Sequence, residues 1–390
     1  MYFYKKINLI LNKLIIIKNN INKPDKLHNA NIGLIILVVN RLILWVLFLI
    51  DRASSYFYIL FFSIIRIIKK NETEKVDFVM CRYKYLCNSE LESIEKITLE
   101  DTLRSNYPDK KILIFFWDIN RPLFFFGINF IKTIAKANPK YLIFSSYSPD
   151  IYYHPMPFLL SRLKKRNISI ISLWWDTCFY DFPISISSVL KTIDIHGIID
   201  NPTMNFGDSK EALILKEKAI NLFTPFELND NNKKFDKDID VVFLGQISRY
   251  RSSRRTFIEF LLDNNIRLHY STYDKEHQCS NEKYYELLSR AKIGINFAMS
   301  VDFYQLKARV FEVMRSGALL LEERNAQTAS YFNEDFEYVA FSSKEELLDK
   351  INFYLKNPNQ RLRIAQAGYE KVIRKFTGTE FWNKLLPNEF

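Results

Sequence analysis

The strongest constraint on the fold of this chain is an alternation that begins near residue 75 and continues almost to the C-terminus. Short runs rich in β-branched and aromatic residues, such as 111–117 and 168–174, alternate with longer stretches of helical periodicity, such as 124–137 and 157–166. Helices that follow successive strands in this way cover the faces of a parallel sheet. The alternation therefore predicts an α/β fold.

The alternation divides into two series separated by the polar stretch 229–238, which lacks hydrophobic periodicity and is typical of a linker. In the first series we predict strands at 76–80, 111–117, 141–145, 168–174, 195–199 and 219–223, with Pro183 in the first turn of a further helix. In the second we predict strands at 240–244, 267–270, 293–297 and 318–321, and helices at 254–264, 284–291, 305–316, 344–355 and 359–374. Two Rossmann-like lobes in series are expected to form a ligand-binding cleft at the carboxyl ends of their strands.

A basic, hydrophobic segment precedes this body. Residues 1–70 contain 11 Lys and Arg but only 2 Asp and Glu, so they account for +9 of the net charge of +11. Apolar residues recur every three or four positions over 3–21, which predicts an amphipathic helix, and two apolar runs follow at 32–50 and 53–68. The nearly neutral body argues against nucleic acid as a partner, because nucleic-acid binding needs a basic surface.

Several placements of residues 32–70 are open. On a continuous helix, Arg41, Arg52 and Arg66 lie within about 40° of one another, and such a face suits the headgroups of an anionic membrane. The alternatives are a single crossing, which Arg41 near its centre disfavours, a re-entrant hairpin that turns at Asp51, and a helix buried against the body. No cleavage site of a signal peptide is visible. We expect a cytoplasmic protein that is peripheral or monotopic at the inner face of the membrane.

The cysteines and histidines are scattered. None of the four cysteines forms a C-x-x-C pair, and no pair of the five histidines has the spacing of metal ligands. The pattern predicts reduced thiols, which fit a cytosolic compartment, and no metal site.

Four segments of the second series carry a family pattern. They are Val241–Gly245; Arg309-Val-Phe-Glu312 followed by Ser316-Gly-Ala-Leu-Leu320; the helix over 343–355; and Ile364-Ala-x-x-Gly368. In order and spacing, residues 240–376 resemble the C-terminal lobe of group-1 glycosyltransferases with the GT-B fold, in particular the spore-maturation-protein-like branch. Trp174-Trp-Asp176 and 222–226 resemble the N-terminal lobe of that family more weakly.

The resemblance implies a domain organisation and an activity. It implies an acceptor lobe at 73–226, a nucleotide-sugar lobe at 227–376 and a C-terminal helix at 377–390 that crosses back to the first lobe. The basic, hydrophobic helical segment at 1–72, predicted above from its own pattern, is an addition to these lobes. The resemblance further implies metal-independent transfer of a sugar from a nucleotide-sugar. For the acceptor we expect an envelope polysaccharide, glycolipid or similar molecule, because an acceptor near the membrane would explain the N-terminal segment. The nucleotide-sugar is then a substrate, and no cofactor is expected.

Arg309 and Glu312 are the leading candidates for donor binding. A diphosphate leaving group that is not held by a metal needs cations or helix amides, and the guanidinium fork of Arg309 suits two phosphate oxygens. Glu312 lies one turn further along the same helix face, where the resemblance implies that it accepts the ribose hydroxyls. The competing interpretation is an Arg309–Glu312 ion pair on a solvated face. Tyr304 replaces a glutamate that related families place eight residues before the ribose glutamate, so the donor sugar and the stereochemistry are not predicted.

Further donor-side candidates surround this pair. Gly245 ends a strand and is expected to let the backbone approach a phosphate, although a plain tight turn explains a single glycine equally well. Arg249 and its neighbours Arg251, Arg254 and Arg255 precede or begin a helix and suit an anion, or form a solvated basic turn. Lys307 is an alternative phosphate ligand. Gly317 is predicted to end the helix as a C-cap and to leave space for the nucleotide.

The acceptor-side candidates are Asp176 and His154. Asp176 follows a predicted buried strand, so it is placed to bind an acceptor hydroxyl or to act as a base, or else to cap the next segment. His154 is a loop residue and a second candidate for an acceptor-side base.

Three other functions compete with glycosyl transfer. A nucleotide-sugar 2-epimerase shares this fold, but the hydrophobic N-terminal segment counts against it. A non-catalytic GT-B protein that binds a nucleotide-sugar or acts as a scaffold is favoured by Tyr304 and disfavoured by the retention of Arg309 and Glu312. A transferase that glycosylates DNA bases is disfavoured by the near-neutral body.

Overall fold

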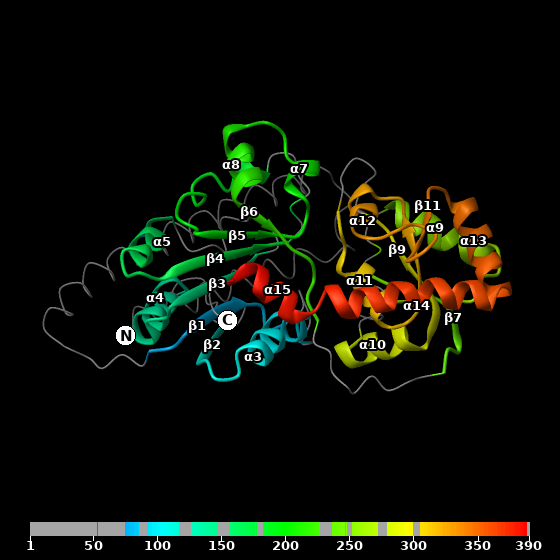
Figure 1. Ribbon diagram of the computed structural model, residues 1–390, viewed down its shortest axis with the longest axis horizontal. Coiled ribbons are helices and arrows are strands. Elements are labelled where there is room, and N and C mark those ends of the chain that lie inside the picture. The colour runs from blue at the N-terminus through cyan, green and yellow to red at the C-terminus, as the bar shows by residue number, and fades with distance from the viewer. Residues whose placement is uncertain are drawn as a thin grey trace, which may run out of the picture. The chain divides into compact units, whose positions relative to one another are not determined.

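The structure is a computed structural model that describes residues 53, 75–85, 92–116, 126–146, 157–175, 177, 182–226, 236–245, 247, 252–271, 279–298 and 305–387. Within these ranges the chain forms two sheets whose strands alternate with helices (Figure 1). One compact unit comprises residues 76–114, 139–150 and 157–390, and a second comprises 1–75, 115–138 and 151–156. The described part of the second unit includes helix α4 (Phe126–Ala137), in which Phe130 packs edge-on against Phe115. The predicted α/β class is confirmed.

The first sheet has the strand order β2-β1-β3-β4-β5-β6. Its strands are β1 (Phe78–Arg82), β2 (Ile112–Phe116), β3 (Tyr141–Ser146), β4 (Ser169–Trp174), β5 (Ile195–Ile198) and β6 (Ala219–Asn221). Strand β1 pairs in parallel with β3, and the parallel pairing continues from β3 through β4 and β5 to β6. The chain runs from β1 to β2 on one side and then to β3 on the other side of β1. The switch point, where open α/β sheets bind ligands, therefore lies at the carboxyl ends of β1 and β3.

The second sheet has the order β11-β10-β9-β7-β8 and is parallel throughout. Its strands are β7 (Ile239–Leu244), β8 (Leu268–Ser271), β9 (Ala291–Asn296), β10 (Leu319–Glu323) and β11 (Val339–Phe341). The chain runs from β7 to β8 on one side and then to β9 on the other side of β7. The switch point of this sheet lies at the carboxyl ends of β7 and β9.

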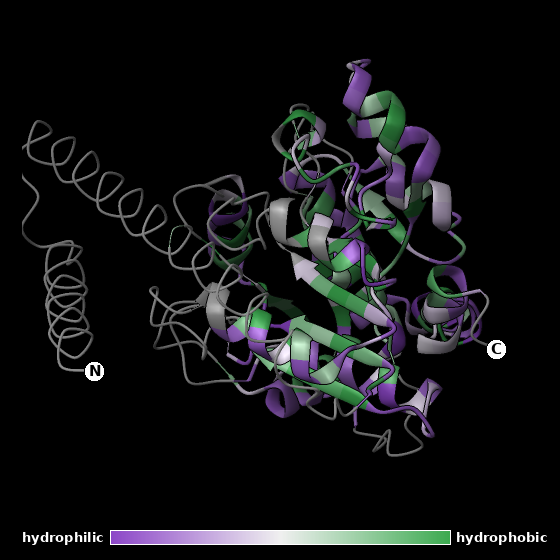
Figure 2. Cartoon of the chain, turned by 90° about the vertical axis from the view of Figure 1, so that its left-hand side faces the viewer, coloured by the Kyte–Doolittle hydropathy of each residue, from purple (hydrophilic) through white to green (hydrophobic). Residues whose placement is uncertain are grey.

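Helices cover both sheets and present an apolar face to the strands. Around the first sheet they are the π-helix η2 (Lys96–Asp101), α3 (Thr102–Asn106), α5 (Pro157–Lys164), α6 (Phe182–Ser185), α7 (Pro202–Asn205) and α8 (Lys210–Lys218). Around the second they are α9 (Ser252–Asp263), α10 (Asn281–Arg290), α11 (Ala308–Arg315), α12 (Ala326–Tyr331), α13 (Lys344–Lys356) and α14 (Pro358–Lys375). Figure 2 shows hydrophobic strands and helices whose hydrophobic and hydrophilic residues alternate, as expected for elements buried on one side.

The C-terminal helix α15 (Gly378–Leu385) packs on helix α3. Trp382 is fully buried, and its indole Nε1 donates a hydrogen bond of 2.9 Å to Thr102 Oγ1. Phe381, beside it, belongs to the same buried cluster as Phe78 of β1 and Phe311 of α11. Helix α15 lies within the predicted range 377–390 and packs against a helix that covers the first sheet.

Several predicted boundaries were wrong for local reasons. The helix predicted over 305–316 begins only at Ala308, because its N-cap residue Lys307 is extended and the Gln305 carbonyl accepts a hydrogen bond from the Asn325 side chain. The helix predicted from residue 284 begins at Asn281, because the Ser280 hydroxyl caps the amide of Lys283. Strand β11 and helices η2, α3, α7, α8 and α12 were not predicted, since they are short or lack a strong apolar period.

The predicted membrane-associating segment lies, except for Ala53, outside the described residues. Over the rest of the described chain, no helix combines the length and the apolar character that a membrane crossing needs. Membrane association remains a prediction.

Candidate functional site

Arg309 occupies the switch point of the second sheet. It lies in the first turn of α11, and its Nη1 donates a 2.8 Å hydrogen bond to Oδ1 of Asn296, the last residue of β9. Its guanidinium stacks on the ring of Phe243 in β7, with Cζ 5.0 Å from the ring centroid. These two contacts fix the fork between the two strands whose carboxyl ends define the ligand-binding point.

Gly245, directly after β7, makes room for this guanidinium. A Cβ atom at Gly245 would lie 2.1 Å from Arg309 Nη2 and 2.8 Å from Cζ. Real Cβ atoms do not approach other heavy atoms so closely, so any other residue here would displace the guanidinium. The role in the approach of a phosphate remains a prediction, while the arginine already supplies a structural reason for the glycine.

A buried carboxylate lies behind the arginine. Asn296 Nδ2 donates a 2.8 Å hydrogen bond to Oε2 of Glu322 in β10, and Thr328 Oγ1 of α12 donates one of 3.1 Å to Oε1. Glu322 is fully buried, and this desolvation raises its pKa to about 8 despite both hydrogen bonds. A chain of contacts thus joins Arg309 to an acid in the sheet core.

Glu312 does not pair with Arg309 on a solvated face, so that competing interpretation is wrong. Its side chain is only 5% exposed, and its Oε2 accepts a 2.5 Å hydrogen bond from the hydroxyl of Tyr284 in α10. Burial raises the pKa of Glu312, opposed by the Tyr284 hydrogen bond and the nearby charges of Arg309 and Arg315. A fixed, buried carboxylate of this kind is suited to accept hydroxyl groups.

Two of the remaining donor-side candidates, Gly317 and Lys307, lie at the two ends of α11, and the third, Arg249, lies outside the described residues. Gly317 has a φ of +67°, and its amide donates to the Met314 carbonyl, so its predicted role as C-cap is confirmed. Lys307 is the N-cap residue of α11, one turn or less from Arg309.

Arg254 was expected to help bind an anion at the start of α9, but it is a structural residue. It is 3% exposed, and its Nη2 donates a 3.1 Å hydrogen bond to the carbonyl of Phe297, just after β9. The buried guanidinium therefore supports the loop that follows β9.

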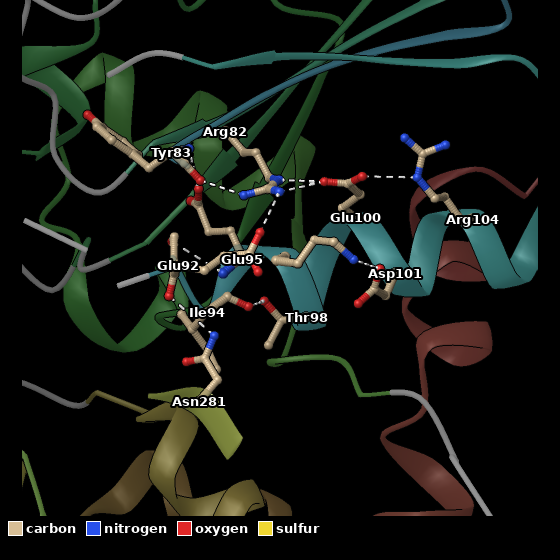
Figure 3. Close-up of polar contacts among 12 residues, drawn as sticks. Arg82, Tyr83, Glu92, Ile94, Glu95, Thr98, Glu100, Asp101, Arg104 and Asn281 are labelled. Atoms are coloured by element: carbon tan, nitrogen blue, oxygen red, sulfur yellow. Dashed lines mark hydrogen bonds and ion pairs between the residues drawn. The ribbon is translucent and has the colours of Figure 1, made fainter. Parts of the chain in front are cut away.

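A second polar cluster lies at the switch point of the first sheet (Figure 3). Arg82, the last residue of β1, is 1% exposed, and its Nε and Nη2 donate to Oε2 of Glu100 at 2.8 and 2.6 Å. Glu100, from η2, also accepts a 3.0 Å hydrogen bond from Arg104 Nε. The Glu92 carbonyl nearby accepts a 3.2 Å hydrogen bond from the side chain of Asn281 in α10.

Glu95 extends this cluster to the ends of β3 and β4. It is 1% exposed; its Oε2 accepts a 2.6 Å hydrogen bond from the Tyr83 amide, and its Oε1 accepts one from the Ser145 hydroxyl. Ser145 Oγ in turn accepts a 2.8 Å hydrogen bond from Nε1 of Trp175. Trp175 directly precedes Asp176, so this buried network holds the backbone beside that candidate. Asp176 and His154 themselves lie outside the described residues.

Sequence reasoning missed Asn296, Glu322 and Tyr284 on the donor side and Glu95 and Ser145 in the first sheet. An apolar strand that ends in a polar residue, as β9 and β10 do, was the only available signal. Among the described residues, no His, Cys, Asp and Glu side chains gather into a group that could hold a metal ion.

Residues 251–386 match the family described as glycosyl transferase-like. No curated protein matches the sequence of the chain. Its fold is similar to that of HepE from Anabaena in complex with UDP-glucose, with a TM-score of 0.55 and 7% identity over 80% of this chain and 98% of that one.

Two further solved structures share the fold. A glycosyltransferase from Rickettsia africae has a TM-score of 0.54 and 11% identity, over 80% of this chain and 100% of that one. An alpha-glucosyltransferase in complex with UDP and a 13-mer DNA containing a HMU base has a TM-score of 0.53 and 10% identity, over 80% and 98%. At these identities the similarity establishes the GT-B fold of two parallel sheets.

Proposed function

We propose that this glycosyltransferase, whose residues 251–386 match the glycosyl transferase-like family, binds a nucleotide-sugar at the switch point of its second sheet and transfers the sugar to a glycan or glycolipid. The observation that carries the proposal is that Arg309 is held at the carboxyl ends of β7 and β9, while Glu312 lies buried one turn further along the same helix. Solved structures of the same fold hold UDP-glucose or UDP, which makes a UDP-sugar the first donor to test. Membership of the spore-maturation-protein-like branch is part of the proposal and rests on the quoted motifs.

The roles of the two residues follow from their surroundings. Transfer breaks the bond between the anomeric carbon and the diphosphate and forms a bond to an acceptor oxygen, while the acceptor hydroxyl loses its proton. Arg309, held against Phe243 and Asn296, is oriented in advance to stabilise the charge that develops on the diphosphate. Glu312 accepts ribose hydroxyls through Oε1, since Oε2 already accepts from Tyr284. Lys307, Gly317 and Arg249 are proposed as further donor contacts.

The acceptor is proposed to bind at the carboxyl ends of the first sheet. Asp176 follows Trp175, whose indole is fixed by the Glu95–Ser145 network, and it is the candidate for binding or deprotonating the acceptor hydroxyl. His154 is the second candidate. The basic, apolar segment 1–72 suits an anionic membrane, which would supply an acceptor close to the inner membrane face.

The test is a thermal-unfolding screen of the full-length protein against UDP-, GDP-, ADP- and dTDP-sugars at millimolar concentration. A ligand that binds only the native state raises the melting temperature by mass action. We expect one nucleotide to stabilise wild type, but not Arg309→Ala or Glu312→Ala. Arg374→Ala, which removes an exposed arginine at the end of α14, is the matched control and should respond like wild type.

Both outcomes are informative. Selective stabilisation assigns the donor class and both residues together, and acceptor screening follows. If no nucleotide-sugar stabilises a well-folded wild type, the protein is better described as a non-catalytic GT-B scaffold.

A further inference from the structure

We propose that Glu322 is a positioning residue of the donor site, which orients Arg309 through Asn296 and whose ionisation weakens donor binding. Glu322 lies in β10 and has no place in the family pattern quoted above. The inference deepens the proposed function and rests on Arg309 being the diphosphate ligand.

The register of β9 and β10 places Asn296 beside Glu322. Asn296 and Glu322 are partners in the parallel pairing of β9 with β10, at the carboxyl end of both strands. Neighbouring residues in register project to the same face of a sheet. Their side chains therefore meet in the core, where both are fully buried.

The side-chain amide of Asn296 is held in one direction by its two partners. Arg309 offers only donors, so it needs the amide oxygen of Asn296, and Glu322 takes the amide nitrogen. If the amide turned over, a nitrogen would face the guanidinium and an oxygen would face the carboxylate. Glu322 consequently holds Asn296 in the orientation that serves Arg309. Thr328 fixes the other carboxylate oxygen, so the acid itself is anchored.

Nearby charges link the protonation of Glu322 to donor binding. Within the described part of the chain, the charged and titratable groups that act on Glu322 are Arg309 of α11, Glu323 of β10 and Tyr338 before β11. Burial outweighs the attraction of Arg309 and raises the pKa of Glu322 to about 8. A diphosphate at Arg309 adds negative charge beside this acid, and it favours the neutral carboxylic acid.

The sign of the pH dependence follows from linkage. Because the bound donor favours protonated Glu322, donor affinity is highest below pH 8 and falls as the pH rises through 8. The ionised carboxylate then competes with the diphosphate for the positive charge of Arg309. We expect the Kd for the donor to increase about fivefold or more between pH 7 and pH 9, a size typical of coupling between two sites.

Glu322→Gln is the decisive variant because glutamine can accept from Asn296 and donate to Thr328 without titrating. The experiment measures the Kd of the full-length protein for UDP-glucose by calorimetry at pH 7, 8 and 9. UDP-glucose is chosen because its diphosphate diester does not titrate in this range. Glu322→Gln should bind as wild type does at pH 7 and keep that affinity at pH 9. Glu322→Leu, which cannot orient Asn296, should bind about three- to tenfold more weakly at every pH.

Lys237 needs its own control because its pKa is lowered to about 8, mainly by burial. Its Nζ donates a 2.7 Å hydrogen bond to the Ser316 carbonyl at the C-terminus of α11. Lys237→Arg stays charged over the whole range and should keep the wild-type pH profile.

The outcomes separate the inference from the proposed function. A flat profile in Glu322→Gln together with a wild-type profile in Lys237→Arg supports the inference. A profile in Glu322→Gln that matches wild type, or full affinity in a folded Glu322→Leu, overturns the inference and leaves donor binding at Arg309 intact. If wild type binds neither UDP-glucose nor any sugar nucleotide of the screen, the proposed function fails, and the inference fails with it.

Discussion

Gly245→Ala tests whether the missing side chain at Gly245 is needed to make room for the guanidinium of Arg309. The new methyl carbon would lie 2.1 Å from Nη2, 2.8 Å from Cζ and 3.3 Å from Nη1 of Arg309. All three atoms belong to the far end of a flexible side chain. The guanidinium can therefore move away while the backbone and the sheet keep their positions.

The size of the effect follows from the contacts that the displaced guanidinium gives up. The hydrogen bond of Arg309 to Asn296 involves a charged donor and contributes about 1.5–3 kcal/mol, and its contact with the Phe243 ring contributes about 0.5–1 kcal/mol. Water can solvate part of the displaced charge, so we expect the free energy of unfolding to fall by no more than about 2 kcal/mol. Donor affinity should fall at least about tenfold, which corresponds to about 1.4 kcal/mol.

Gly294→Ala is the matched comparison because it places a methyl group in the same sheet against a rigid neighbour. That methyl carbon would lie 2.6 and 2.7 Å from the two Cγ atoms of Val313 and 3.2 Å from its Cβ. A β-branched side chain in a helix cannot turn away, so overpacking should lower the free energy of unfolding by about 1–3 kcal/mol. Gly294→Ala should mainly lose stability, and Gly245→Ala should mainly lose donor affinity.

The assay combines urea unfolding with calorimetric titration of UDP-glucose for wild type and both variants. A Gly245→Ala protein that binds the nucleotide-sugar as tightly as wild type would show that the position of the guanidinium does not matter. A Gly245→Ala protein that unfolds more easily than Gly294→Ala would show instead that the glycine serves the backbone.

Three further predictions concern buried polar groups. Tyr284→Phe removes the donor to the Glu312 carboxylate, so we expect urea unfolding to show a loss of about 1–3 kcal/mol and titration to show weaker donor binding. Arg82→Ala removes two hydrogen bonds to the buried carboxylate of Glu100 and should lower the free energy of unfolding by about 3–5 kcal/mol in the same assay. The double replacement Arg82→Met with Glu100→Leu should restore most of that stability. Equal losses in the single and the double variant would refute this expectation. His196 is buried between Trp174 and the Leu190 carbonyl, and burial lowers its pKa to about 4. Its contribution to the free energy of unfolding is therefore fully present above about pH 6.5. That contribution, up to about 3 kcal/mol, is lost as the pH drops through 4. His196→Gln should lose less stability than wild type over that acid range.

The sequence was a reliable guide where a pattern is local. The alternation of apolar runs and helical stretches predicted every described strand except β11 to within a few residues, because a strand buried on both faces must be apolar. Gly317 predicted the end of α11, because a left-handed residue there favours glycine. The spacing of three residues between Arg309 and Glu312 placed both on one helix.

Boundaries and short elements were less predictable. Helix α11 starts three residues later than its periodicity suggests, because Asn325, far along the chain, binds the backbone of Gln305. The strand Val339–Phe341 is too short to show a period, and it forms because β10 offers it a pairing edge.

The sequence alone determined the α/β class, the division of the strands into two series, and the pair of side chains that the family pattern marks, Arg309 and Glu312. Only the tertiary structure decided what those side chains do, because their partners come from distant elements. The spacing also allowed a solvated ion pair between Arg309 and Glu312, but Glu312 is instead bound to the hydroxyl of Tyr284. Asn296, which is hydrogen-bonded to Glu322, orients the guanidinium of Arg309. Periodicity reports which residues are buried, whereas hydrogen-bond partners depend on the strand order, which brings β7, β9 and β10 to one edge of the sheet.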